Sequence, residues 1–144
     1  MPDLPTGTVT FLYIDIEGST ALAQQFPAEL PALLARHHAV LHQTIQANNG
    51  YVFQITGDAF CAAFHTASDA LNAALDAQRG LQHESWNPAW IKVRMGIHAG
   101  STQAGAIEER GVRLLAWTDA WRDKIGDHRP PIEQAIGYAL EKQA

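Results

Sequence analysis

Residues 8–16 read TVTFLYIDI, a run of β-branched and aromatic residues that lies between Gly7 and Gly18. Such a run predicts a β-strand that is buried on both of its faces. Asp15 is the only charged residue in it. A charge in so apolar a strand must be paired or must bind a metal ion, because burying it alone is costly. The end of this strand is therefore a candidate site.

The chain changes to helical spacing after Thr20. Pro27 and Pro31 predict that the first part of this region divides into two helical pieces. An Asn-Asn-Gly sequence that finishes at Gly50 predicts the end of the second piece. The expected buried stripe consists of Leu30, Leu33, Leu34, His37, Leu41 and Ile45.

Two short apolar runs follow, residues 51–55 and 59–64, and a Thr-Gly-Asp sequence ending at Asp58 separates them. This spacing and turn chemistry predict a β-hairpin with Asp58 at its turn. An aspartate at a turn most often has a structural role, since its side chain bonds to its own backbone. If the hairpin lies beside the first strand, however, the carboxylates of Asp15 and Asp58 reach one edge of the sheet and could hold hard cations.

A second amphipathic helix is expected to begin at a cap, Thr66 or Ser68, and to end before Pro88. Its expected buried stripe is Leu71, Ala74, Leu75, Gln78 and Leu81. Apolar side chains alternate with others over residues 91–97, which predicts a fourth strand that closes at Gly100. The order strand, helices, strand, strand, helix, strand predicts an α/β (α+β) fold with a ferredoxin-like βααββαβ core.

This core is complete at about residue 100. We therefore expect one domain over residues 1–100 and a divergent tail over residues 101–144 that packs on the same domain or extends it. Within the tail the pattern predicts a helix from about Val112 to Lys124, a break at two consecutive prolines, and a short final helix.

The formal net charge of −5 leaves no basic surplus to neutralise a nucleic-acid backbone, so we expect no nucleic-acid partner. A single nucleotide is not excluded, because a divalent cation held by carboxylates can supply positive charge. No apolar run approaches the ~18 residues of a membrane span, and we expect a cytoplasmic protein without a membrane partner. Cys61 is the only cysteine, which excludes an internal disulfide.

Gly18, Ser19 and Thr20 follow the first strand and open the first helix. Their backbone N–H groups could hold phosphate oxygens at the positive end of the helix dipole. A plain Ser or Thr helix cap explains the same residues equally well when the two aspartates are left aside.

Three segments, FLYIDIEGST (11–20), FQITGDAFCAAF (53–64) and VRMGIHAG (93–100), together resemble the successive motifs of class III adenylyl and guanylyl cyclases. The resemblance implies that Asp15 and Asp58, with the backbone carbonyl of Ile16, hold two Mg²⁺ or Mn²⁺ ions. It implies a lyase that converts ATP or GTP to a cyclic nucleotide and pyrophosphate, with a site built across a homodimer. The residues that it assigns to phosphate binding are Glu17, Gly18, Ser19, Thr20 and Arg94, and the one that it assigns to the purine is Gln54.

The chain departs from the family pattern at two places. Gln54 stands where the family usually has a lysine that reads the purine, and an amide discriminates adenine from guanine less sharply than a charge. The family's later asparagine and arginine, which bind ribose and stabilise the transition state, are not recognisable, and no asparagine follows Asn87. No residue is therefore identified for transition-state stabilisation, and each missing group predicts a loss of about 10²- to 10³-fold in rate.

The sequence leaves three readings open. We expect a domain that binds a divalent metal and a purine triphosphate with little turnover. One alternative is an active homodimeric cyclase that uses residues of the tail. The other is a non-catalytic module, in which the cyclase-like front is a folded platform and the helical tail with Trp117 and Trp121 binds a partner or a second copy. Residues 113–134 resemble a stretch near the helical C-terminal region of large bacterial regulators, although an amphipathic helix that covers the sheet explains them as well.

Overall fold

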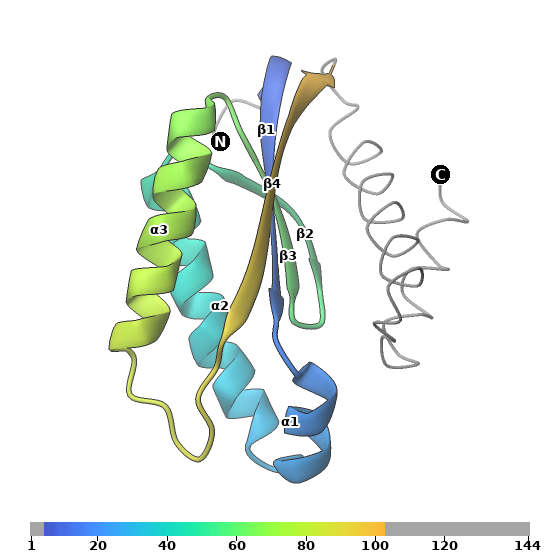
Figure 1. Ribbon diagram of the computed structural model, residues 1–144, viewed down its shortest axis with the longest axis vertical. Helices are drawn as coiled ribbons and strands as arrows, with labels where there is room; N and C mark the ends of the chain where they lie inside the picture. The colour runs from blue at the N-terminus through green and yellow to red at the C-terminus, as the bar shows by residue number, and fades with distance from the viewer. Residues whose placement is uncertain (1–4, 103–144) are drawn as a thin grey trace, which may run out of the picture.

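The computed structural model describes residues 5–102, which form one antiparallel sheet with helices on one of its faces (Figure 1). The elements are β1 (Gly7–Ile16), α1 (Ser19–Gln25), α2 (Leu30–Ala47), β2 (Tyr51–Thr56), β3 (Ala59–Phe64), α3 (Ala67–His83) and β4 (Val93–Thr102). The strand order is β2-β3-β1-β4. This arrangement confirms the predicted ferredoxin-like core, whereas the helices expected after residue 112 lie outside the described residues.

β1 is an internal strand of this sheet, as its apolar sequence predicts. It pairs with β3 from Thr10 opposite Phe64 to Ile14 opposite Phe60. On its other edge it pairs with β4 along its whole length. The backbone of β1 is therefore hydrogen-bonded on both sides, and its side chains alternate between the two faces of the sheet.

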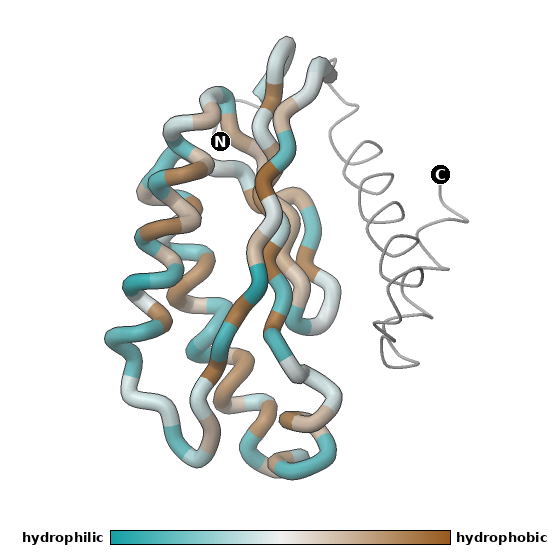
Figure 2. The backbone as a smooth tube through the Cα atoms, in the orientation of Figure 1, coloured by the Kyte–Doolittle hydropathy of each residue, from teal (hydrophilic) through white to brown (hydrophobic). Residues whose placement is uncertain are grey.

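The face of the sheet under α2 and α3 carries the larger hydrophobic cluster. Leu12 and Ile14 of β1 are buried there together with Phe60 and Phe64 of β3. Apolar and polar residues alternate along both helices, which lie side by side against this face (Figure 2). The opposite face has a smaller cluster, with Val9, Phe11 and Ala63 buried and packed against Tyr13 and Phe53.

α2 buries most of the residues that its spacing predicts, whereas Leu30 and Leu34 are only half-buried. Its fully buried side chains are Leu33, His37, Leu41 and Ile45. The chain between Phe26 and Glu29 separates α1 from α2, and Pro31 stands in the first turn of α2, where the backbone N–H needs no helical partner. The expected division into two helical pieces is confirmed.

The stripe predicted for α3 is partly wrong. Leu71 and Leu75 are 53% and 44% exposed. The buried residues of α3 are instead mostly small, namely Ala70, Ala73, Ala74, Ala77 and Leu81. Small side chains allow the helix to lie close to the sheet and to α2, and a Cβ at Gly80 would come within 2.9 Å of Val40 on α2. The predicted cap is confirmed, since the Thr66 hydroxyl accepts a hydrogen bond from the backbone N–H of Asp69 at 3.1 Å.

The fourth strand begins later than the alternation predicts and ends two residues beyond Gly100. Ile91 precedes β4 and is buried with Ile16 and Leu33 in a third cluster, so its apolar character reflects loop packing and not a strand. In the part of the chain that the structure describes, no helix combines the length and the hydropathy needed to cross a membrane.

His37 is the one polar side chain in the buried stripe of α2. It is 0% exposed and packs edge-on against the ring of Phe60, and its Nδ1 lies 3.2 Å from Nδ1 of His38. Its Nε2 is buried without a hydrogen-bond partner among the described residues. Burial, and secondarily the charge of His38, lower the pKa of His37 from 6.5 to about 4. The imidazole is therefore neutral in the folded protein near pH 7.

We predict that this histidine makes the fold sensitive to acid. The unfolded chain protonates His37 near pH 6.5, whereas the folded chain does so only near pH 4. Its contribution to the free energy of unfolding is thus fully present above pH 6.5 and is lost as the pH falls toward 4, by up to about 3 kcal/mol.

Urea unfolding of the wild type and of His37→Leu between pH 7 and 4 measures this effect. The variant should lose less stability over the range than the wild type does. His83→Gln, which alters an exposed histidine at the end of α3, serves as the matched control and should follow the wild type. Equal pH slopes for wild type and His37→Leu would contradict the prediction.

Candidate metal and nucleotide site

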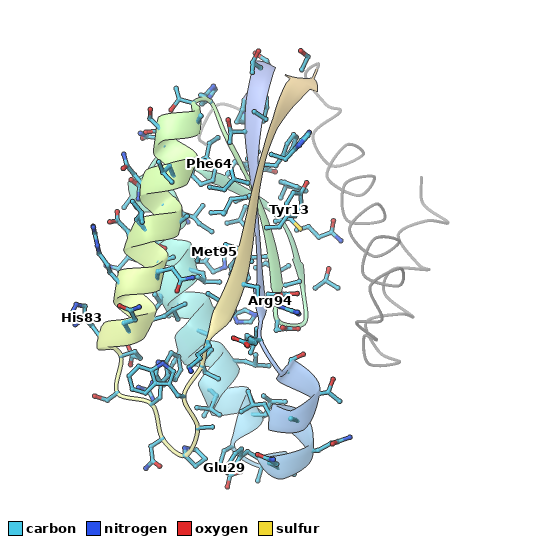
Figure 3. The ribbon with its side chains drawn as sticks, viewed as in Figure 1. Tyr13, Glu29, Phe64, His83, Arg94 and Met95 are labelled. Atoms are coloured by element: carbon cyan, nitrogen blue, oxygen red, sulfur yellow. The ribbon has the colours of Figure 1, made fainter. Side chains whose placement is uncertain are left out.

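The candidate site lies where β1 ends and where the β2–β3 turn approaches it. β1 and β4 run antiparallel with Asp15 opposite Arg94. Asp15 follows Tyr13 on the face of the sheet that does not carry α2 and α3, because side chains alternate along a strand. Figure 3 shows Arg94 on β4 near the level of the β2–β3 turn, with Tyr13 farther along the sheet.

Asp15 and Arg94 form a two-point ion pair across the strands. The Nε atom of Arg94 donates to Oδ1 of Asp15 at 3.0 Å, and Nη2 donates to Oδ2 at 3.1 Å. The side chain of Asp15 is 15% exposed and that of Arg94 is 43% exposed. This geometry satisfies the carboxylate that the sequence places in an apolar strand. Arg94 was expected at the phosphates, and here its guanidinium is on Asp15.

Asp58 is held at the same end of β1 by a different contact. Its Oδ2 accepts a hydrogen bond from the backbone N–H of Ile16 at 2.8 Å. The turn before it contains Gly57 with φ of +60°, a left-handed conformation that glycine adopts without strain. The three residues expected to hold metal, Asp15, Ile16 and Asp58, therefore come together at one place, although the hairpin and β1 are far apart in sequence.

The turn from β1 into α1 has a defined backbone geometry. Gly18 is the N-cap residue of α1 and has a left-handed conformation, and no side chain caps the helix. The alternative of a plain Ser or Thr cap is therefore wrong for this helix. The backbone N–H of Glu17 donates to the carbonyl of Lys92 at 2.8 Å. Glu17 is thus bound to the start of β4 through its amide, and the backbone groups left for phosphate are those of Gly18, Ser19 and Thr20.

Gln54 lies farther from the carboxylates than the other expected site residues. It stands on β2 opposite Cys61, beyond an irregularity in pairing that follows Val52. Its Nε2 donates to the hydroxyl of Thr56 at 3.2 Å. Because β3 separates β2 from β1, Gln54 is two strands away from Asp15. A ligand that touched both would have to extend across β3.

The donor set fits a hard divalent cation. Two carboxylates and a backbone carbonyl are oxygen ligands of the kind that Mg²⁺ and Mn²⁺ prefer. Between residues 5 and 102 there is no cluster of three or more His, Cys, Asp or Glu side chains arranged to hold a metal. A cation on Asp15 and Asp58 would thus complete its shell with water or with phosphate oxygens, as Mg²⁺ commonly does.

The pairing of Asp15 with Arg94 is the contact at the candidate site that sequence reasoning missed. Asp15 is the only acidic residue of β1, and Arg94 is the only arginine or lysine within β4. This complementarity was available in the sequence. It becomes informative only once the register of the two strands is known, because one residue of slip would place the side chains on opposite faces.

Known proteins resemble this chain over most of the described region. An uncharacterized protein of Mycobacterium tuberculosis is 40% identical over 101 residues, which cover 69% of this chain and 33% of that protein. The adenylate cyclase of Lachancea kluyveri is 34% identical over a match that covers 67% of this chain and 6% of that protein. The chain thus spans about a third, or much less, of the length of these relatives.

The fold is similar to that of solved cyclases. A structure of adenylate cyclases from Trypanosoma brucei in their monomeric state matches with a TM-score of 0.64 and 25% identity, over 69% of this chain and 58% of that chain. The family described as the adenylate and guanylate cyclase catalytic domain matches residues 1–121. Because this match covers well over half of the chain, the protein belongs to that family, the class III nucleotidyl cyclases.

Proposed function

We propose that this domain binds one or two Mg²⁺ or Mn²⁺ ions through Asp15, Asp58 and the carbonyl of Ile16, and with them ATP or GTP. The observation that carries the proposal is the hydrogen bond of 2.8 Å from the Ile16 N–H to Asp58, which brings the second carboxylate to the residue that follows Asp15. A structural aspartate at a hairpin turn would bond within its own turn, whereas this one reaches another strand.

The negative charge of the site favours binding of the metal and the nucleotide together. Two carboxylates on a chain of net charge −5 repel a triphosphate unless a cation lies between them. A divalent ion at this position would polarise the phosphate and activate the ribose hydroxyl, the chemistry that the family performs. Arg94 and the backbone N–H groups of Gly18, Ser19 and Thr20 add the donors that phosphate oxygens require.

Gln54 is the proposed contact to the purine. Its amide can donate and accept, so it can bond to either adenine or guanine. A nucleotide whose triphosphate bound at the turn near Gly18 and whose base lay across β3 would place that base near Gln54. We propose further that the domain acts as a homodimer in the cytoplasm, and that residues 101–144 form a divergent helical tail of the same domain.

A second candidate function is a non-catalytic module that binds a partner. The observation that favours it is the pair of large apolar side chains that α3 leaves exposed, Leu71 and Leu75. Large apolar residues one helical turn apart are typical of a helix face that contacts another protein. This candidate does not require a metal, so a metal titration separates the two.

We predict that the wild-type protein binds Mn²⁺ and that Asp58→Asn lowers the affinity at least about tenfold, because it removes one anionic ligand. Asparagine keeps an oxygen that can accept the Ile16 N–H, so the melting temperature should change little. Asp58→Ala would remove both the anionic ligand and the acceptor of the Ile16 N–H, so its effect on metal affinity could not be separated from an effect on stability.

Electron paramagnetic resonance of free Mn²⁺ measures the affinity. Asp76→Asn is the matched control, since Asp76 is an exposed carboxylate of α3 that contacts Arg79 at 3.8 Å. Unchanged Mn²⁺ affinity in Asp58→Asn would exclude the metal role of that residue. Absence of Mn²⁺ binding in the wild type would favour the partner-binding module.

We also predict that binding exceeds catalysis. Metals on Asp15 and Asp58 would still polarise the phosphates, yet the family's asparagine and arginine are not recognisable in this chain. With Mn²⁺ and ATP or GTP, the rate of cyclic nucleotide formation should be at least ~10³-fold below that of a relative that carries both residues.

Chromatographic detection of cyclic AMP and cyclic GMP measures turnover. The shift in melting temperature with a nonhydrolysable triphosphate measures binding. A thermal shift without measurable turnover is the expected result. Robust turnover that Asp15→Asn abolishes would instead assign the transition-state role to a residue of the tail.

A further inference from the structure

Arg94 donates to both carboxylate oxygen atoms of Asp15. The two hydrogen bonds, 3.0 Å and 3.1 Å long, use both sides of the carboxylate. A metal ion that bound this carboxylate would meet the guanidinium in the same place. The charge of this carboxylate is therefore balanced by a guanidinium from within the chain.

We propose that Arg94 is an internal counter-ion that a divalent cation must displace from Asp15, and that it then transfers to the phosphates of the nucleotide. This inference rests on the proposed function, and it adds that metal binding and nucleotide binding are coupled through one side chain. The cation alone binds weakly because it breaks the ion pair. The nucleotide strengthens cation binding because it gives the displaced guanidinium new anionic partners.

The burial of the two partners indicates which one moves. The Asp15 side chain is 15% exposed on an internal strand, whereas that of Arg94 is 43% exposed on β4. Arginine has a long side chain with several rotatable bonds, so its head group can leave while its backbone stays in the sheet. Displacement thus requires a rotamer change at the surface and no rearrangement of the core.

The second carboxylate does not depend on this exchange. Asp58 is held by the backbone N–H of Ile16, a main-chain donor that a rotamer change of Arg94 leaves in place. At the candidate metal site, Asp58 is therefore already positioned, whereas Asp15 is engaged in an ion pair. A divalent ion has twice the charge of a guanidinium, so it can replace the arginine at a carboxylate pair where a monovalent ion would not.

The strength of the pair sets the size of the effect. A two-point guanidinium–carboxylate pair is stronger than a neutral hydrogen bond, but partial exposure and salt weaken it. Such a contact predicts a reduction of Mn²⁺ affinity of roughly three- to tenfold in the absence of nucleotide. Coupling is reciprocal, so Mn²⁺ should strengthen nucleotide binding by a similar factor through this residue.

The first experiment uses the unmodified chain. In a ¹⁵N-labelled sample, the Nε–H resonance of Arg94 should shift or broaden during a Mg²⁺ titration, with the same apparent affinity as metal binding. Arg36 is an internal reference, because its guanidinium is paired with Glu84 beside Trp86, away from the site. Metal binding that left the Arg94 resonance unchanged would overturn the inference and leave the proposed function standing.

The second experiment compares variants by Mn²⁺ titration without nucleotide. Arg94→Met should bind Mn²⁺ three- to tenfold more tightly than the wild type, while Arg94→Lys, which keeps the charge but not the two-point contact, should gain less. Arg79→Met removes an exposed arginine of α3 and should bind as the wild type does. Equal affinity in Arg94→Met and wild type would overturn the inference.

A third measurement separates this inference from the function on which it rests. Adding a nonhydrolysable triphosphate should increase the Mn²⁺ affinity of the wild type more than that of Arg94→Met. An equal increase in both would contradict the transfer of Arg94 to the phosphates. If neither wild type nor Arg94→Met bound Mn²⁺, the proposed metal site and this inference would both be wrong.

Discussion

The backbone of β1 is hydrogen-bonded on both edges, and its side chains are packed on both faces. A strand in this position tolerates a charge only where the strand ends or where a partner is supplied. Asp15 meets both conditions, since it is the penultimate residue of β1 and is paired with Arg94. The burial of one strand thus confines the polar chemistry to one end of the sheet.

The hairpin and the turn into α1 are positioned by the same end of β1. Asp58 is held by the backbone of Ile16, and Glu17 is held by the backbone of Lys92. These contacts use main-chain groups, so they depend on the path of the chain more than on particular neighbouring side chains. The carboxylates and the possible phosphate donors are therefore oriented by the sheet, and the sheet in turn is stabilised by α2 and α3 on its other face.

The sequence predicts well what depends on local pattern. The hairpin, the division before α2 and the buried residues of α2 follow from turn chemistry and helical spacing. The large apolar residues of α3 give a wrong prediction of its buried face. Close packing requires alanines on that face, and Leu71 is exposed. The site residues were identified by resemblance, whereas the contact between Asp15 and Arg94 depends on strand register, which no local pattern determines.

The cross-strand ion pair also has a consequence for how the sheet assembles. In β4 the side chains of Met95 and Val93 face the helices, while Arg94 lies on the opposite face. If β4 shifted by one residue against β1, the guanidinium would enter the apolar layer beneath α3 and Asp15 would lose its partner. The free-energy cost of these two unpaired charges arises only in the shifted register. The ion pair therefore favours the observed register of β4 over its alternatives.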